Sequence, residues 1–269
     1  MLKKALRNLV PPIIYSCASR VKLKFLPEKC GFFGNYKNYE EVLKFTEGYE
    51  KNEIIEYVYH QTLQGIKTRE QNHQLNARYQ QLLAALYIAQ NSMEDGLTIL
   101  DFGGALGAHY FSIINLLRRD TIKNWIVCET SLMSSKGQQN LADNKLKFIS
   151  NIEECKNVRI DIVLASCSLQ YLEDPMKMLE TLIGLNAGAL ILNRVPFIDE
   201  EKDRLTLQVV PEQLHGGSMP AWFFSKSKWM SKLLKKYQLI AQWPVPEDVV
   251  CLDGKSIVYQ GFVLKRNDS

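Results

Sequence analysis

The stretch Thr98-Ile-Leu-Asp-Phe-Gly-Gly-Ala-Leu-Gly-Ala-His-Tyr-Phe111 constrains the fold of this chain more than any other. Its first residues favour a buried β-strand that carries one acid, Asp101. A turn rich in glycine follows, and apolar residues then recur at helical spacing. The glycines are Gly103, Gly104 and Gly107, and the apolar series is Tyr110, Ile113, Ile114 and Leu117. The stretch therefore predicts a strand, a tight turn and a helix, the first unit of a nucleotide-binding α/β domain. Glycines let backbone approach a ligand, and the helix start offers free N–H groups to an anionic group.

The chain after this unit alternates between buried strands and helices. Strands are expected at 124–129, 145–149, 159–165 and 188–193. Asp174-Pro175 begins a helix between the last two, with a cap residue followed by proline at the first helical position. Such alternation predicts parallel βαβ units.

The C-terminal part departs from this alternation. A helix opens at Ser225 or Ser227 and buries Trp229, and strands are expected near 239–245 and 256–265. Because no helix separates these two strands, they can pair only as an antiparallel hairpin through 246–255.

The N-terminal part divides into two further segments. Residues 1–29 are basic and apolar together, and we expect them either to touch an anionic membrane surface or to pack on the domain. Residues 30–50 mix aromatic residues with Gly and Asn, which predicts a loop-like lid over a ligand or a packing cluster. Helices are expected from 52 to 91. The expected domains are therefore 1–29, 30–95 as a helical cap and lid, and 96–269 as the nucleotide-binding domain.

Composition narrows the class of protein. The chain has 269 residues, 46% of them hydrophobic, which is enough for a globular core. A net charge of +4 is too small to indicate a nucleic-acid partner. The six cysteines show no C-x-x-C spacing, which favours a reducing cytoplasm over a disulfide framework or a zinc site. We also see no His, Asp and Glu cluster that indicates a metal.

The motifs resemble those of class I S-adenosylmethionine-dependent methyltransferases. The resemblance is carried by Ile99-Leu-Asp-Phe-Gly-Gly-Ala-Leu-Gly107, by Glu129 at the end of the second strand and by Asp161-Ile-Val-Leu-Ala-Ser-Cys-Ser-Leu-Gln-Tyr-Leu172. It implies a Rossmann-like sheet of seven strands, the last antiparallel, flanked by helices and preceded by a helical extension.

A narrower resemblance extends over residues 30–266. Gly31-Phe-Phe-Gly-Asn-Tyr, Gly48-Tyr-Glu, Leu169-Gln-Tyr-Leu and Tyr259-Gln-Gly are similar to a family of methyltransferases encoded in bacterial surface-polysaccharide (O-antigen) gene clusters. This resemblance implies a cytoplasmic enzyme that O-methylates a sugar or a lipid-linked glycan intermediate, at the inner face of the membrane if residues 1–29 bind there.

The expected cofactor is S-adenosyl-L-methionine. Its ammonium and sulfonium groups are favoured near Asp101, whereas a pyrophosphate there would meet a like charge. Glu129 is expected to accept both ribose hydroxyls, although an NAD site uses an acid in the same way. Ala105 departs from the family motif, which usually has glycine there. The candidate cofactor contacts are Asp101, Gly103, Gly104, Ala105, Gly107, Glu129, Asn151 and Ser166. For Asn151 an adenine contact and an ordinary turn residue are both open.

The acceptor side offers fewer candidates. A hydroxyl acceptor needs a base that is poised near neutral pH, and histidine is the natural one. His215 is the candidate base, because it lies in an expected flexible loop after the fifth strand, and Tyr171 is a candidate to orient the acceptor. His60 and His73 are expected at the surface, and His109 is expected to pack or cap near the turn.

The sequence alone leaves two other functions open. An NAD(P)-dependent sugar oxidoreductase or epimerase would use a similar first unit, but Asp101, Ala105 and the closing hairpin count against it. A non-catalytic Rossmann-like module that acts as a partner in an assembly is the other alternative.

Overall fold

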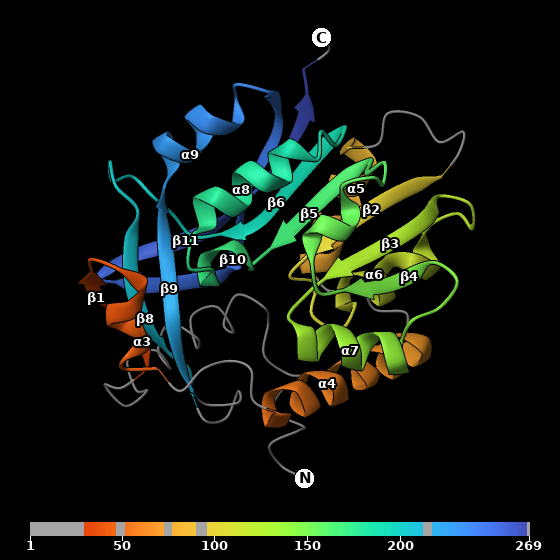
Figure 1. Ribbon diagram of the computed structural model, residues 1–269, viewed down its shortest axis with the longest axis horizontal. Coiled ribbons are helices and arrows are strands. Elements are labelled where there is room, and N and C mark those ends of the chain that lie inside the picture. The colour runs from red at the N-terminus through yellow and green to blue at the C-terminus, as the bar shows by residue number, and fades with distance from the viewer. Residues whose placement is uncertain (1–29, 47–51, 73–76, 90–95, 212–216, 268–269) are drawn as a thin grey trace.

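The computed structural model describes residues 30–46, 52–72, 77–89, 96–211 and 217–267, and a seven-stranded sheet forms its centre (Figure 1). The strand order is β10-β11-β6-β5-β2-β3-β4. The strands are β2 (Leu97–Phe102), β3 (Ile122–Cys128), β4 (Leu146–Ile149), β5 (Ile162–Ser166), β6 (Ala189–Val195), β10 (Tyr237–Leu252) and β11 (Lys255–Arg266). Because β2 is paired on both sides, its carboxyl end and the glycine turn lie in the middle of the sheet edge.

The strand directions confirm the predicted sheet. Strands β4, β3, β2, β5 and β6 are parallel, and β11 is antiparallel to both of its neighbours, β6 and β10. The hairpin turn is shorter than the predicted 246–255, because β10 continues to Leu252 and β11 resumes at Lys255. Asp253 and Gly254 form the turn, with φ of 49° and 78°. Two successive positive φ angles match the twist of a hairpin, and Asp-Gly is a favoured pair for them.

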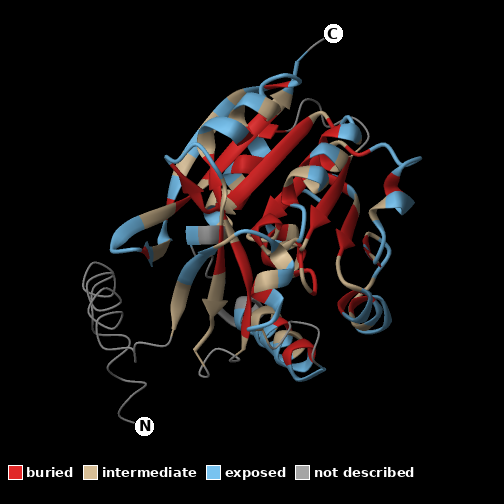
Figure 2. Ribbon diagram, turned by 60° about the vertical axis from the view of Figure 1, so that its left-hand side comes forward, coloured by how far each residue is buried: buried red, intermediate tan, exposed pale blue. Residues whose placement is uncertain are grey.

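Helices cover both faces of this sheet. Helices α8 (Pro175–Gly184) and α9 (Lys226–Leu233) pack on one face through Leu179, Leu182, Trp229 and Leu233. Helices α5 (Ala77–Ala89) and α6 (Ala108–Ile113) pack on the other through Leu82, Leu86, Tyr110 and Ile113. The central strands β2, β5 and β6 are buried on both sides, which explains why their sequences are mostly apolar. Figure 2 shows the buried residues concentrated in the sheet.

Helix starts follow their caps. The Asp174 side chain accepts from Lys177 N at 2.9 Å at the start of α8, and Ser225 caps α9. The sequence left Ser225 and Ser227 open as the start of α9, and the structure selects Ser225.

The remaining helices lie at the edge of the domain. Helix α4 (Asn52–Asn72) contacts α6 and α7 (Ser131–Asn140), beside which it lies in Figure 1. A small cluster of Ile55, Leu106 and Met133 joins them, and Lys136 Nζ lies 2.7 Å from Glu56 Oε1. Short helical turns are α3 (Tyr39–Leu43), η2 (Ile114–Leu116), η3 (Ile152–Cys155) and η4 (Leu169–Tyr171).

A second sheet was not predicted. It has the order β1-β8-β9-β7, from β1 (Gly31–Tyr36), β7 (Phe197–Ile198), β8 (Arg204–Val209) and β9 (Ser218–Ser225). The prediction of a loop over 30–50 was therefore wrong for β1 and α3, and the prediction of a flexible loop over 213–220 was wrong for 218–220, which begin β9. Residues 47–51 and 212–216 lie outside the described residues.

The second sheet holds the end of the long hairpin. Phe32, Phe223 and Leu252 share one apolar cluster, and Phe32 and Phe223 meet edge to face at 5.0 Å. Arg204 Nη1 lies 2.6 Å from Asp253 Oδ2 and its Nη2 donates to Gly34 O at 2.9 Å. One arginine thus links β1, β8 and the hairpin turn.

Residues 1–29, for which we expected membrane contact, lie outside the described residues. Among the helices that are described, none is long and apolar enough to span a bilayer.

Candidate functional site

The glycine turn lies at the carboxyl end of β2 and is packed against its surroundings. Gly103 and Gly107 have φ of 69° and 77°, a region that favours glycine. A Cβ on Gly103 would lie 2.2 Å from Cβ of Ser168, and one on Gly104 would lie 2.5 Å from the Asp101 carboxylate. Two of the glycines are therefore required by the packing of the turn itself.

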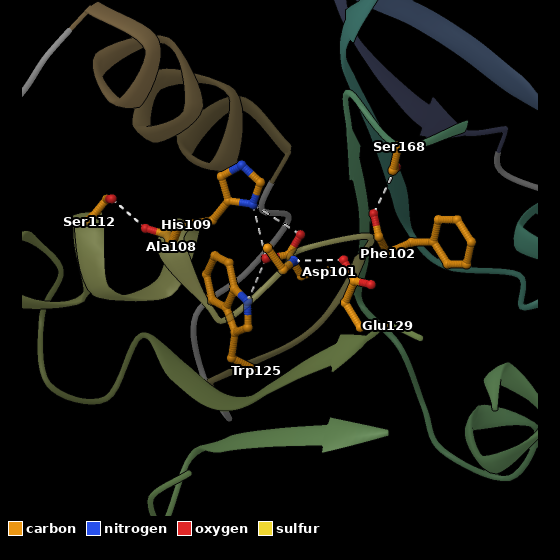
Figure 3. Close-up of polar contacts among 9 residues, drawn as sticks. Asp101, Phe102, Ala108, His109, Ser112, Trp125, Glu129 and Ser168 are labelled. Carbon is orange, nitrogen blue, oxygen red and sulfur yellow. Dashed lines mark hydrogen bonds and ion pairs between the residues drawn. The ribbon is translucent and has the colours of Figure 1, made fainter. Parts of the chain in front are cut away.

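Asp101 lies beneath this turn and is completely buried. Its carboxylate accepts from Trp125 Nε1 at 3.1 Å and lies 3.0 Å from Nδ1 of His109 (Figure 3). These contacts join β2, β3 and α6. The expected role of Asp101 toward a bound cofactor stays a prediction. His109 was expected to pack or cap, and the structure places it as the partner of this buried carboxylate.

Glu129 follows β3 and reaches across to the turn. Its Oε1 accepts from Ala105 N at 3.0 Å and its Oε2 accepts from Thr130 N at 2.9 Å. Ala105 is in the left-handed region with φ of 49°, and the bond to Glu129 fixes it there. Glu129 and the turn thus form one structural unit.

The two other candidate cofactor contacts differ in their surroundings. Ser166 is the last residue of β5 and is buried. Its hydroxyl has no hydrogen-bond partner among the described residues. Asn151 caps η3, where its Oδ1 accepts from Glu153 N at 3.0 Å and its own N donates to Glu154 Oε1 at 3.3 Å. Asn151 thus acts as an ordinary turn residue, with its side-chain oxygen already bonded. A cofactor contact would use its amide nitrogen.

Tyr171 lies in η4, close to Cys167, Arg194 and Tyr259. Burial first, and then the neighbouring Cys167 and Tyr259, raise the pKa of Tyr171 well above its usual value, against the opposing effect of Arg194. The Tyr171 hydroxyl therefore stays protonated and can only donate or accept a hydrogen bond, which agrees with an orienting residue and not with a base.

The predicted base, His215, lies outside the described residues, as does His73. His60 is exposed on α4. Among the described residues, no three His, Cys, Asp or Glu side chains gather as metal ligands would.

Sequence reasoning did not single out a partly buried ion pair beside Tyr171. Arg194 ends β6 and donates to Asp248 of β10, from Nε at 2.5 Å and from Nη2 at 3.1 Å. Burial lowers the pKa of Arg194, but Cys167 and the hydrogen-bonded Asp248 raise it more, so the guanidinium stays charged. The only sequence signal was the polar pair Asn193-Arg194 after five apolar residues of a strand, whereas Asp248 fell inside an expected turn.

The strand order, with β11 inserted antiparallel between β6 and β10, defines a Rossmann-like sheet of the class I methyltransferase type. No protein-family model and no curated protein matches the chain.

Solved structures that resemble the chain have 12–16% sequence identity to it. One is LepI in complex with S-adenosylhomocysteine and a substrate analogue (12% identity, TM-score 0.46), of which the match covers 46%, against 69% of this chain. A candidate S-adenosylmethionine-dependent methyltransferase from Listeria monocytogenes matches over 69% of this chain and 97% of its own (12% identity, TM-score 0.47). The Burkholderia thailandensis 1,6-didemethyltoxoflavin-N1-methyltransferase, bound to 1,6-didemethyltoxoflavin and S-adenosylhomocysteine, matches over 79% and 90% (12% identity, TM-score 0.47).

Proposed function

We propose that the protein is an S-adenosylmethionine-dependent methyltransferase that acts on a small hydroxylated molecule. The observation that supports this most is the acidic border of the glycine turn, where Asp101 lies beneath the turn and Glu129 is bonded to it. Two carboxylates favour a ligand with cationic groups over a dinucleotide, whose pyrophosphate carries negative charge. The antiparallel strand β11, inserted between β6 and β10, also disfavours the sheet of a dinucleotide-dependent dehydrogenase.

The residues present fit such a cofactor. The Glu129 carboxylate, next to the turn, is placed to accept ribose hydroxyls. The buried Ser166 hydroxyl ends β5, the neighbour of β2, where the cofactor and an acceptor would meet. Gly103, Gly104, Ala105 and Gly107 would line the cofactor from the turn, and Asn151 would offer its amide nitrogen. When bound, the cofactor supplies an electrophilic methyl group on a sulfonium.

The protein's own contribution is alignment, which can supply a large part of the rate enhancement in a transfer between two bound reactants. Tyr171, as a protonated donor, would hold an acceptor oxygen in place. His215 remains our proposed base, since a hydroxyl acceptor must lose its proton during the transfer.

The finer proposal is that the acceptor is a sugar or glycan intermediate of surface-polysaccharide biosynthesis. Its support is the motif resemblance over 30–266 alone. On this proposal the enzyme works in the cytoplasm, and the basic, apolar segment 1–29 would hold it at the inner face of the membrane, near a lipid-linked acceptor.

Calorimetry with S-adenosylhomocysteine and with NAD+ tests the cofactor. We expect the first to bind and the second to be silent. Glu129→Gln should weaken S-adenosylhomocysteine binding by about tenfold or more, because hydrogen bonds to a charged group contribute about 1.5–3 kcal/mol. Glu180→Gln, which changes an exposed side chain of α8, is the matched control and should bind S-adenosylhomocysteine as the wild type does.

The outcomes separate the alternatives. NAD+ binding would replace the methyltransferase with the oxidoreductase, and silence toward both ligands would support the non-catalytic module. Unchanged affinity in Glu129→Gln would remove Glu129 from the cofactor site.

A further inference from the structure

Three buried polar atoms at the carboxyl edge of the sheet have no hydrogen-bond partner within the described part of the chain. They are Ser166 Oγ on β5, Asn193 Oδ1 on β6 and Trp243 Nε1 on β10. Ser166 and Asn193 are only 5% and 2% exposed. A buried polar group that lacks a partner destabilises the fold, and native proteins rarely leave several of them together.

The strand register places these atoms in one row. Ser166 pairs with Asn193, and both continue the face that carries Leu164 and Ile191. Trp243 packs against the same face. Its indole lies over Gly261 of β11, where an added Cβ would fall 2.4 Å from Nε1. Gly261 stands between the pairs Gln260–Val195 and Phe262–Leu192, and therefore opposite a bulge formed by Asn193 and Arg194. The absence of a side chain at Gly261 lets Trp243 reach across β11 toward β6.

The row begins beside the glycine turn. Phe102 pairs with Ala165, so the next residues, Gly103 and Ser166, are neighbours at the edge. Helix α5 crosses β6 and β11 on this face. Its Gln81, one turn before the buried Ala85, adds a fourth buried polar atom, Oε1, without a partner among the described residues.

Backbone strain is found at the same edge. Ala105, Cys167 and Arg194 follow or end β2, β5 and β6 in the left-handed region, with φ of 49°, 57° and 56°. Such non-glycine conformations are strained and are found most often at ligand-binding and active sites. Strain and unpartnered polar atoms therefore coincide at the ends of adjacent strands.

We propose that the row Ser166–Asn193–Trp243 binds the methyl acceptor and that this acceptor is an uncharged molecule carrying several hydroxyl groups. The proposal rests on the proposed function, because the Ser166 end adjoins the turn assigned to the cofactor. The row offers one acceptor, one donor and one group that is both, which hydroxyls match because each can donate and accept. Arg194 and Asp248, which lie beside the row, neutralise each other in a two-point ion pair, so an ionised ligand would find no free counter-charge in this pair.

Saturation-transfer NMR with methyl glycosides of glucose, galactose, mannose and rhamnose tests this on the full chain, with saturating S-adenosylhomocysteine. At least one glycoside should bind the wild type, and the glucuronate methyl glycoside should bind more weakly. Asn193→Leu and Trp243→Phe should each weaken glycoside binding by about tenfold, the value of one or two neutral hydrogen bonds. Trp229→Phe is the matched control, since its Nε1 is also buried without a described partner but lies on the opposite face.

A stability measurement separates ligand binding from a structural role. If the Asn193 oxygen serves a ligand, Asn193→Leu should leave the melting temperature unchanged or raise it while glycoside binding is lost. A lower melting temperature with intact binding would overturn the proposal, as would no glycoside binding to the wild type or preferred binding of the glucuronate. S-adenosylhomocysteine affinity should not change in either variant. If the wild type bound glycosides but not S-adenosylhomocysteine, the row would stand and the proposed function would fail.

Discussion

At the scale of single residues, Asp101 shows how a motif residue can serve the fold first. The carboxylate is buried beneath Gly104, and Trp125 and His109 contact its oxygens. A ligand on the turn would be separated from it by the turn backbone. We therefore expect Asp101 to act on cofactor binding without direct contact, by holding the turn in shape and by placing a negative charge beneath it.

Asp101→Asn tests that expectation. The amide keeps one acceptor oxygen but brings an N–H group toward a nitrogen partner, so the free energy of unfolding should fall by about 2 kcal/mol. Urea unfolding measures the change. Asp120→Asn, on the exposed surface, should change stability by less than about 0.5 kcal/mol. A fully stable Asp101→Asn protein that no longer binds S-adenosylhomocysteine would instead assign Asp101 a direct contact with the cofactor.

At the scale of elements, the β10–β11 hairpin depends on the contact between Gly261 and Trp243. A Cβ at position 261 would lie 2.2 Å from the Trp243 indole, which cannot move freely within a sheet. Gly261→Ala should lower the free energy of unfolding by about 1–3 kcal/mol through overpacking. Chemical denaturation checks this value.

The second substitution makes the cause testable. Adding Trp243→Leu to Gly261→Ala should recover part of the loss, so that the two changes are not additive. Gly184→Ala is the matched control, because no atom lies within 4 Å of its added Cβ. Full additivity of the two changes would show that Gly261 is needed for its backbone conformation and not to leave room for the Trp243 indole.

The sequence predicted the elements whose pattern is local. The five parallel strands are rich in apolar residues, and α8 and α9 begin at clear caps. Strand β1 was missed because its sequence, Gly-Phe-Phe-Gly-Asn-Tyr, carries two glycines with positive φ, which are typical of loops. Strand β9 was missed because Pro220 interrupts it and its residues do not alternate between buried and exposed.

The polar row could not be predicted for a different reason. Asn193 and Trp243 are 50 positions apart in sequence and come together only through the register of β6 with β11 and of β11 with β10. Glu129 was found because an acid after a second buried strand is a local signal, whereas its bond to Ala105 depends on the packing of the turn.

At the scale of the whole molecule, the two sheets meet along the hairpin. Its base belongs to the central sheet, and its tip packs with Phe32 and Phe223 of the second sheet. The proposed acceptor row lies on the central sheet where this hairpin joins it. The second sheet can therefore influence the acceptor side without changing the turn that is assigned to the cofactor.

The buried thiols set the stability of the molecule at alkaline pH. Burial, reinforced by Cys155, Glu129 and Glu154, raises the pKa of Cys128 to about 12, and burial with Glu154 raises that of Cys155 to about 11. The unfolded thiols ionise near pH 9, so above this pH the unfolded chain releases protons that the folded chain keeps. The free energy of unfolding should be constant below about pH 8 and should then fall as pH rises toward 11–12, by up to about 1.4 kcal/mol per pH unit for each thiol.

Urea unfolding between pH 7.5 and pH 10, in the presence of a reductant, measures this fall. Buried tyrosines such as Tyr171 and Tyr259, whose pKa values burial also raises, add to it only above about pH 10. Replacing Cys128 and Cys155 with Ala should lower stability at every pH but flatten the decline between pH 9 and pH 10. Cys251→Ala, at an exposed position, should keep the full decline. If the thiols retain their protons in the folded chain, removing both of them must make the decline with pH less steep. An unchanged decline in the double variant would therefore mean that other groups cause the alkaline sensitivity.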